Sequence, residues 1–264
     1  MKKQQSKRVI PGFGLTMGVT LAMLSIVVLI PLASLAVYSA RLGFREFIQV
    51  ITRPRVLSGF YVSFITAFAA TVVNAIMGLI LAWVLVRYDF PGKRIMDGMI
   101  ELPFALPTAV AGISLTSLTS DQGLIGSFFA KFGIKIAYTR IGITVALIFV
   151  GIPFVARAVQ PVLEKLDGSY EEAARVMGAK PAYIFRRVIL PELLPPLLIG
   201  TGLAFGRCLG EYGSVVFIAG NRPYETEITP LIIMSELQEF DYQSATSIAL
   251  VMLIASFLIL FLMN

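Results

Sequence analysis

The sequence contains no histidine and only one cysteine among its 264 residues. Without an imidazole, the chain cannot build a Ser-His-Asp triad, a His-ligated zinc site or an imidazole proton relay. With one thiol, Cys208, it forms neither an intramolecular disulfide nor a multi-thiolate metal site. It also lacks a GxxxxGK[ST] run, the phosphate-binding loop sequence of many ATPases. We therefore expect no catalytic residues, metal or cofactor in this chain itself.

Charge is scarce as well. Charged residues make up 14% of the chain and hydrophobic residues 57%, with a mean hydropathy of +0.83. An ordinary globular chain carries about a quarter charged residues, so this one lacks the polar surface that water requires. The composition indicates an integral membrane protein.

Long uncharged stretches locate the membrane spans, because a spanning helix needs about 20 apolar residues. We predict one all-α transmembrane domain over 1–264 with six spans, at 13–38, 60–86, 99–118, 141–161, 197–219 and 244–263. The third span contains Pro103 and Pro107, which should kink or break its first turns. The fourth carries Arg157 near one end, where its long stem can reach the interface.

The distribution of lysine and arginine predicts the orientation of these spans. With the amino terminus inside, the inner segments hold thirteen of these residues and the outer segments eight. The positive-inside rule therefore favours both termini in the cytoplasm. Four of the inner residues precede the first span: Lys2, Lys3, Lys7 and Arg8. The apolar run after them is longer than the apolar core of a signal peptide, which typically has 7–15 residues, so we predict an uncleaved span.

The inner segment 164–196 is polar, yet its sequence is typical of two short helices. Ser169 and Glu172 have the spacing of a capping box, in which each side chain binds a free backbone amide. Gly178 is placed to end this first helix in the left-handed conformation. Pro181 suits the first position of a second helix. From these residues alone, the segment is either a docking element or simply a well-capped surface loop.

Four groups of residues resemble a known family. Glu172-Ala173-Ala174, Gly178, Val188 and Leu190-Pro191 have the spacing of the EAA loop of ABC-importer permeases, with Val188 where isoleucine is usual. The runs LPFALPTAVAG (102–112), LGEYG with VFIAGN (209–213 and 216–221) and LQEFDY (237–242) resemble the CysT (CysU) type of sulfate/thiosulfate permease. The similarity covers the chain except for a short basic tail, which the family usually has and which this sequence lacks after Asn264.

This resemblance implies a type I ABC-importer permease fold in a bacterial inner membrane. The EAA loop would couple to an ATPase through Ser169, Glu172, Ala173, Ala174, Gly178, Val188, Leu190 and Pro191. The implied partners are two copies of a CysA-type ATPase that binds ATP and magnesium, a CysW-type permease, and a periplasmic sulfate/thiosulfate-binding protein. Membrane lipid surrounds the complex, and we expect no nucleic acid partner.

Two charges lie inside the fifth predicted span. Arg207 and Glu211 are four residues apart, hence on one helical face and able to pair. Either charge alone near the bilayer centre costs about 2.5–3.5 kcal/mol, so both must face protein or water. They are either a structural ion pair or groups that line or gate an anion route. Gly202, Gly206 and Gly210 form an adjacent stripe of small residues that permits close helix packing.

The proline-containing third span is a second candidate for the transport route. Unwound backbone at membrane depth is tolerated only where protein covers it or where it faces a cavity. We therefore expect Pro103, Pro107 and Thr108 to border the pathway.

Energetics favour an ATP-driven importer over the alternatives. Moving a dianion inward against an inside-negative potential costs about 4.6 kcal/mol per 100 mV, and the chain shows no energy source of its own. A molybdate or tungstate ABC permease is the neighbouring alternative. A secondary anion transporter would leave the EAA loop without a role, and a membrane enzyme would have only scattered carboxylates to use.

Overall fold

The computed structural model describes residues 13–263, and every regular element in that range is a helix. The basic residues Lys2, Lys3, Lys7 and Arg8, on which the predicted orientation partly rests, lie outside the described residues, as does Asn264.

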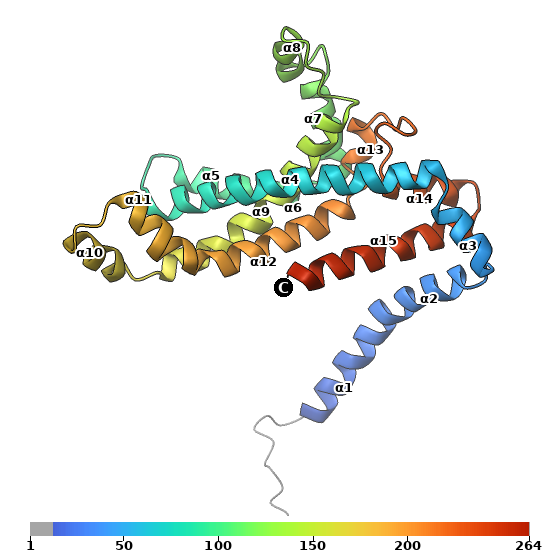
Figure 1. The fold of residues 1–264 in the computed structure, drawn as a ribbon, viewed down its shortest axis with the longest axis horizontal. Coiled ribbons are helices and arrows are strands. Elements are labelled where there is room, and N and C mark those ends of the chain that lie inside the picture. The colour runs from blue at the N-terminus through green and yellow to red at the C-terminus, as the bar shows by residue number, and fades with distance from the viewer. Residues whose placement is uncertain (1–12, 264) are drawn as a thin grey trace, which may run out of the picture.

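Three helices form the centre of the bundle: α4 (Pro54–Arg87), α9 (Arg140–Lys165) and α12 (Leu190–Leu209). They lie along the long axis of the molecule (Figure 1) and pack against one another. Small residues allow this close approach. A Cβ atom at Gly78 would lie 2.7 Å from Val155 Cβ, and one at Gly200 would lie 2.8 Å from Ala158 Cβ.

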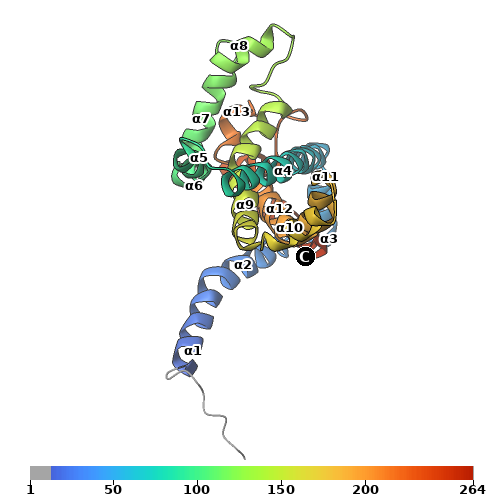
Figure 2. The same ribbon diagram turned by 90° about the vertical axis from the view of Figure 1, so that its left-hand side faces the viewer.

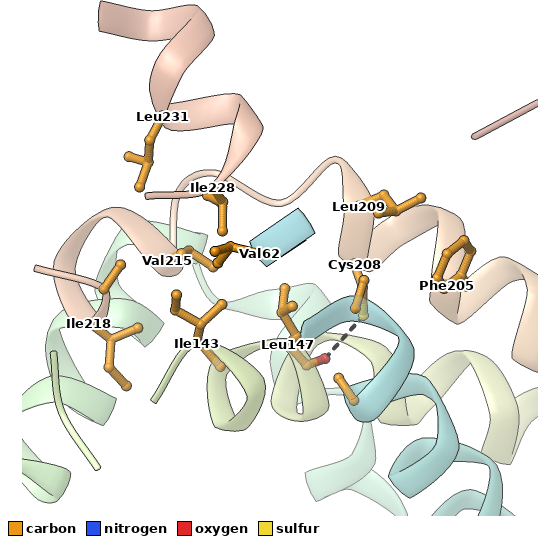
Figure 3. Packing of buried hydrophobic residues seen from close by; sticks show 14 of the residues in the cluster. Val62, Ile143, Leu147, Phe205, Cys208, Leu209, Val215, Ile218, Ile228 and Leu231 are labelled. Carbon is orange, nitrogen blue, oxygen red and sulfur yellow. Dashed lines mark hydrogen bonds between the residues drawn. The ribbon is translucent and has the colours of Figure 1, made fainter. Parts of the chain in front are cut away.

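A hydrophobic cluster fills one half of this centre (Figure 3). Ile143 and Leu147 of α9 meet Phe205 and Cys208 of α12 and Val62 of α4. The lone thiol is buried, and its Sγ lies 3.4 Å from the Leu147 carbonyl oxygen, to which it donates. It is a packing residue of the core.

Within residues 13–263, five helical stretches are long and apolar enough to cross a membrane, so the chain is a multi-pass membrane protein. They are Phe13–Ser39, Pro54–Arg87, Arg140–Lys165, Pro181–Leu209 and Tyr242–Leu262. The first comprises α1 (Phe13–Leu24), a π-helical turn η1 (Ser25–Leu29) and α2 (Ile30–Ser39). The fourth comprises α11 (Pro181–Ile184), the π-helical turn η2 (Phe185–Ile189) and α12, and the last is α15 (Tyr242–Met263).

Two predicted spans differ in the structure. The third, 99–118, is broken into α5 (Lys93–Ile100), α6 (Leu102–Ala105) and α7 (Thr108–Thr119), because the prolines interrupt it as their chemistry predicts. The prediction of one continuous helix for the fifth span, 197–219, is wrong. Helix α12 ends at Leu209, and the chain continues through a non-helical segment into α13 (Val215–Ile218). Apolar side chains continue past the end of α12, so the hydropathy of the sequence does not reveal where the helix ends.

The two ends of the bundle carry different elements (Figure 1). At one end lie α10 (Ser169–Val176) and α11, and at the other lie α3 (Phe44–Ile51) and α14 (Thr229–Gln238). We call these the α10 end and the α14 end. Two parts project sideways from the bundle, namely α7 with α8 (Leu124–Ala130), and α1, which swings away on the opposite side (Figures 1 and 2).

Candidate functional site

The loop at the α10 end contains the two predicted helices, and its turn has the predicted form. Gly178 adopts a left-handed φ of 81° after the last turn of α10. Its amide donates to the Arg175 carbonyl at 2.9 Å, and the Ala179 amide donates to the Ala174 carbonyl at 3.0 Å. These two bonds define a Schellman motif. Pro181 is the first residue of α11, also as predicted.

The start of α10 differs from the prediction. Gly168 is the N-cap residue and Ser169 already lies within the helix, so the capping box between Ser169 and Glu172 was wrong. Asp167 Oδ1 instead accepts from the Ser169 amide at 2.9 Å. The backbone and side-chain hydrogen bonds from Ser169 lower the pKa of the Asp167 carboxyl. A carboxylate binds a free amide more strongly than a hydroxyl does, so Asp167 takes the role predicted for Ser169.

The two faces of α10 separate residues that are adjacent in sequence. Glu171 and Ala174 are buried against the bundle, whereas Glu172 and Ala173 are exposed. The motif Glu172-Ala173-Ala174 therefore presents only its first two residues outward.

The sequence reasoning missed the two residues at the loop apex. Val176 is 89% exposed and Met177 is 81% exposed. Large apolar side chains immediately before the turn glycine of a polar loop were the available signal. Bare apolar residues at the tip of a rigid turn are typical of a protein-docking surface.

The end of the motif secures the loop to the bundle. Val188 is partly buried and packs on the cluster that includes Leu163 and Leu193. Leu190 is half-buried and Pro191 is exposed in the first turn of α12. Val188 and Leu190 therefore face their own chain, whereas Pro191 faces outward.

The non-helical segment 210–214 holds the predicted ion pair. Arg207 lies in the last turn of α12, and its guanidinium pairs with Glu211, which lies beyond the helix end. Glu211 is only 2% exposed. The amide and the hydroxyl of Ser214 each donate to Glu211 Oε1 at 2.8 Å. The carboxylate is therefore fully partnered, while the Arg207 side chain remains 34% exposed.

The two helix breaks meet in space. A Cβ atom at Gly213 would overlap Thr108 Oγ1 in the first turn of α7, and one at Gly112 would overlap the Ser214 carbonyl. Pro107 is extended, and the helix begins directly after it. The structure thus brings Thr108 beside the segment that carries Glu211. Pro103 is buried in α6, which packs on α9.

The glycine stripe of α12 does not form one seam. Gly202 is buried. Gly206 faces α15, where its Cβ would lie 3.2 Å from a Leu260 methyl carbon. Gly210 is exposed, and no neighbouring helix comes within 4 Å of a Cβ placed there. Gly200 makes the closest approach to α9 instead.

A family model, described as binding-protein-dependent transport system inner membrane component, matches residues 74–264. The chain belongs to this family. In sequence it is 49% identical to the sulfate transport system permease protein CysT of Salmonella typhimurium over 259 residues, 98% of this chain and 94% of that protein. Identity and coverage are the same for the CysT protein of Escherichia coli, and the Synechocystis CysT protein is 48% identical over 93% of this chain and 86% of that protein.

Solved structures of ABC transporters share the fold. A bacterial ABC transporter involved in the import of the acidic polysaccharide alginate superposes with a TM-score of 0.78 at 16% identity, over 96% of this chain and 94% of that chain. The same transporter in complex with an alginate-bound periplasmic protein gives the same TM-score, at 17% identity over 96% of this chain and 92% of that chain. An amino acid ABC transporter gives 0.58 at 20% identity, over 84% of this chain and 96% of that chain.

In this permease, Arg157 of α9 binds two carboxylates of the broken third segment. Its guanidinium lies 2.6 Å from Asp97 Oδ1 of α5 and 2.9 Å from Glu101 Oε1 just beyond α5. These two ion pairs hold the broken third segment, which contains α5, against α9. Within residues 13–263, no cluster of three or more His, Cys, Asp or Glu residues could hold a metal ion.

Proposed function

We propose that this chain is the membrane-spanning subunit of an ATP-driven importer that moves sulfate or thiosulfate into the bacterial cytoplasm through the inner membrane. The observation that carries the proposal is the rigid α10 turn with its bare apolar apex, on a chain that has no phosphate-binding loop of its own. Near-full-length similarity to sulfate transport permeases supports the substrate.

The α10 end faces the cytoplasm in this proposal, together with both termini. Glu172, Ala173, Val176 and Met177 insert into a CysA-type ATPase, of which the complex carries two copies with bound ATP and magnesium. The partly buried Val188 and Leu190 hold the loop at its base. The broken segment α5–α7 then counts as the sixth span, alongside the five long helices.

A second permease of the CysW type completes the transport route. None of the α1 residues is buried, although this helix is strongly apolar. Lipid and a neighbouring permease are the surfaces that cover such a helix. The pathway runs past the place where the two helix breaks meet, near Thr108 and the exposed part of Arg207. A periplasmic binding protein delivers the anion to the α14 end.

The decisive experiment is gentle solubilisation of the complex, identification of the co-purifying subunits, and ATPase assays with binding protein loaded with each oxyanion. We expect an ATPase to co-purify and sulfate- or thiosulfate-loaded binding protein to stimulate it. Stimulation by molybdate or tungstate alone would show that the substrate assignment is wrong. If no ATPase co-purifies and none can be reconstituted, the whole proposal fails.

A substitution at the loop apex tests the docking surface itself. Val176→Asp places a charge on an apolar contact, and we expect the affinity for the ATPase to fall about 30-fold or more. Phe44→Asp, at an equally bare position on α3 at the other end (82% exposed), is the control and should leave ATPase capture unchanged. Equal capture by both variants would contradict the assigned surface.

A further inference from the structure

Helix α4 runs the whole length of the bundle, and an ion pair secures each of its ends. The helix has 34 residues, which at 1.5 Å per residue makes it about 51 Å long. Its only proline is Pro54, at the first position, where it does not kink the helix. It is therefore a straight, rigid connection between the α10 end and the α14 end (Figure 1).

At the α10 end, the last residue of α4 holds the loop. The Arg87 guanidinium pairs with Glu171 Oε1 of α10 and lies 5.4 Å from the centroid of the Trp83 ring, one turn earlier in α4. Glu171 is only 8% exposed, and its second oxygen lies 3.6 Å from Arg175. Besides Glu171, Ala174 is the one buried residue of α10. The ion pair is thus the main polar attachment of this helix to the bundle.

At the α14 end, the second residue of α4 does the same for another segment. Arg55 Nε donates to Glu227 Oε2 at 2.8 Å, and Arg55 Nη2 donates to Glu227 Oε1 at 2.5 Å. Such a two-point pair fixes orientation as well as distance. Glu227 is 2% exposed and precedes Thr229, whose amide donates to Ser63 Oγ of α4 at 2.8 Å. The segment between α13 and α14 is therefore tied to α4.

We infer that α4 is a strut that transmits movement of the α10 loop to the segment between α13 and α14, with Arg87 and Glu171 as its positioning residues. The inference rests on the proposed coupling of α10 to an ATPase. A partner that pulls α10 also pulls α4, because separating the pair would leave the buried Glu171 carboxylate with only the longer, 3.6 Å contact to Arg175 of its own helix. The two neighbouring glutamates have different roles in this inference. Glu171 is buried and pairs with α4, whereas Glu172 is exposed and faces outward.

The first experiment measures sulfate transported per ATP hydrolysed, in the full complex in lipid nanodiscs and vesicles with sulfate-loaded binding protein. Glu171→Gln and Arg87→Gln should each lower this ratio about tenfold while the ATPase remains bound and active. The charge-exchanged double variant, Arg87→Glu with Glu171→Arg, should give a higher ratio than either single change. Asp89→Asn is the matched control, since it breaks an exposed pair with Lys93 at the same end.

An unchanged ratio in both single variants would overturn the inference, and so would a double variant no better than the single ones. A purely structural pair would reduce the amount of assembled complex and leave the ratio intact.

The second experiment needs no ATPase and so separates the two proposals. A spin label is placed on Val176→Cys in the full chain with Cys208→Ala, so that the label reports the mobility of α10. Mobility should rise with Glu171→Gln and with Arg87→Gln but not with Asp89→Asn. Equal mobility in all three would overturn the strut while leaving the proposed function intact. Raised mobility, together with an unlabelled parent chain that captures no ATPase, would support the attachment and count against the proposed function alone.

Discussion

The packed helices α4, α9 and α12 and the isolated helix α1 are all apolar enough to cross a membrane, yet they differ completely in their neighbours. The most apolar windows have a mean hydropathy of 2.4 for the stretch that starts with α1 and 2.3 for α4, but 0% and 33% of these windows are buried. One difference lies in the small residues. Gly78 and Gly200 contact another helix, whereas a Cβ at Gly18 of α1 would meet nothing within 4 Å. Hydropathy therefore locates a membrane helix, whereas glycine contacts mark where two helices of the chain approach each other most closely.

The largest effect should come from adding one methyl group to the packed centre. In Gly200→Ala the new Cβ would lie 2.9 Å from Val155 Cα and 3.0 Å from the Phe154 carbonyl, both backbone atoms of α9 that cannot move aside. We expect a loss of about 1–3 kcal/mol of stability, visible as earlier thermal unfolding in detergent. Gly18→Ala is the matched control in α1 and should change stability by less than about 0.5 kcal/mol. Similar losses in both variants would remove the contrast between the two regions.

The next largest effect is expected at the end of the packed helix α12, beside the proposed transport route. Arg207→Ala leaves the buried Glu211 without its cationic partner and removes a partly exposed positive charge beside the proposed route. We expect sulfate uptake into vesicles to fall about tenfold or more while the subunits still co-purify. Arg45→Ala, an exposed arginine of α3, should leave uptake unchanged. Normal uptake with Arg207→Ala would reduce this ion pair to a structural brace.

The smallest effect is expected at the rim of the α14 end. Burial raises the pKa of the Glu236 carboxyl above its ordinary value of 4.5, although Arg53 partly opposes the rise. A raised carboxyl pKa contributes stability that is complete below the ordinary value and is lost as the pH rises through the raised one. Glu236→Gln should therefore unfold at the same temperature as the parent or slightly higher near neutral pH.

Acidification should remove that advantage, because the parent carboxyl is then neutral as well. The whole change should stay below about 1 kcal/mol. Thermal unfolding of both proteins at about pH 4 and about pH 7 gives the comparison. A variant clearly less stable than the parent at neutral pH would show that the pair with Arg53 outweighs burial.

Much of the fold follows from local chemistry. The prolines at 103 and 107 break the third span as expected, and the turn at Gly178 is where a left-handed residue was expected. The N-cap residue of α10 is Gly168, one residue before the predicted Ser169, and the side chain that accepts from the first turn is that of Asp167. The fifth predicted span extends past the end of α12 at Leu209, because apolar residues continue through the non-helical segment around Glu211.

The sequence by itself determined that this chain lies in a membrane, where most of its helices run and how its exposed loop turns, because these depend on composition and on neighbours within about four residues. Only the tertiary structure decided which of two adjacent glutamates faces inward. It also decided that Thr108 meets Gly213 and that Arg55 meets Glu227, 172 residues away. Such pairs depend on which helices pack together, and hydrophobic periodicity carries no information about charged partners so far apart in the chain.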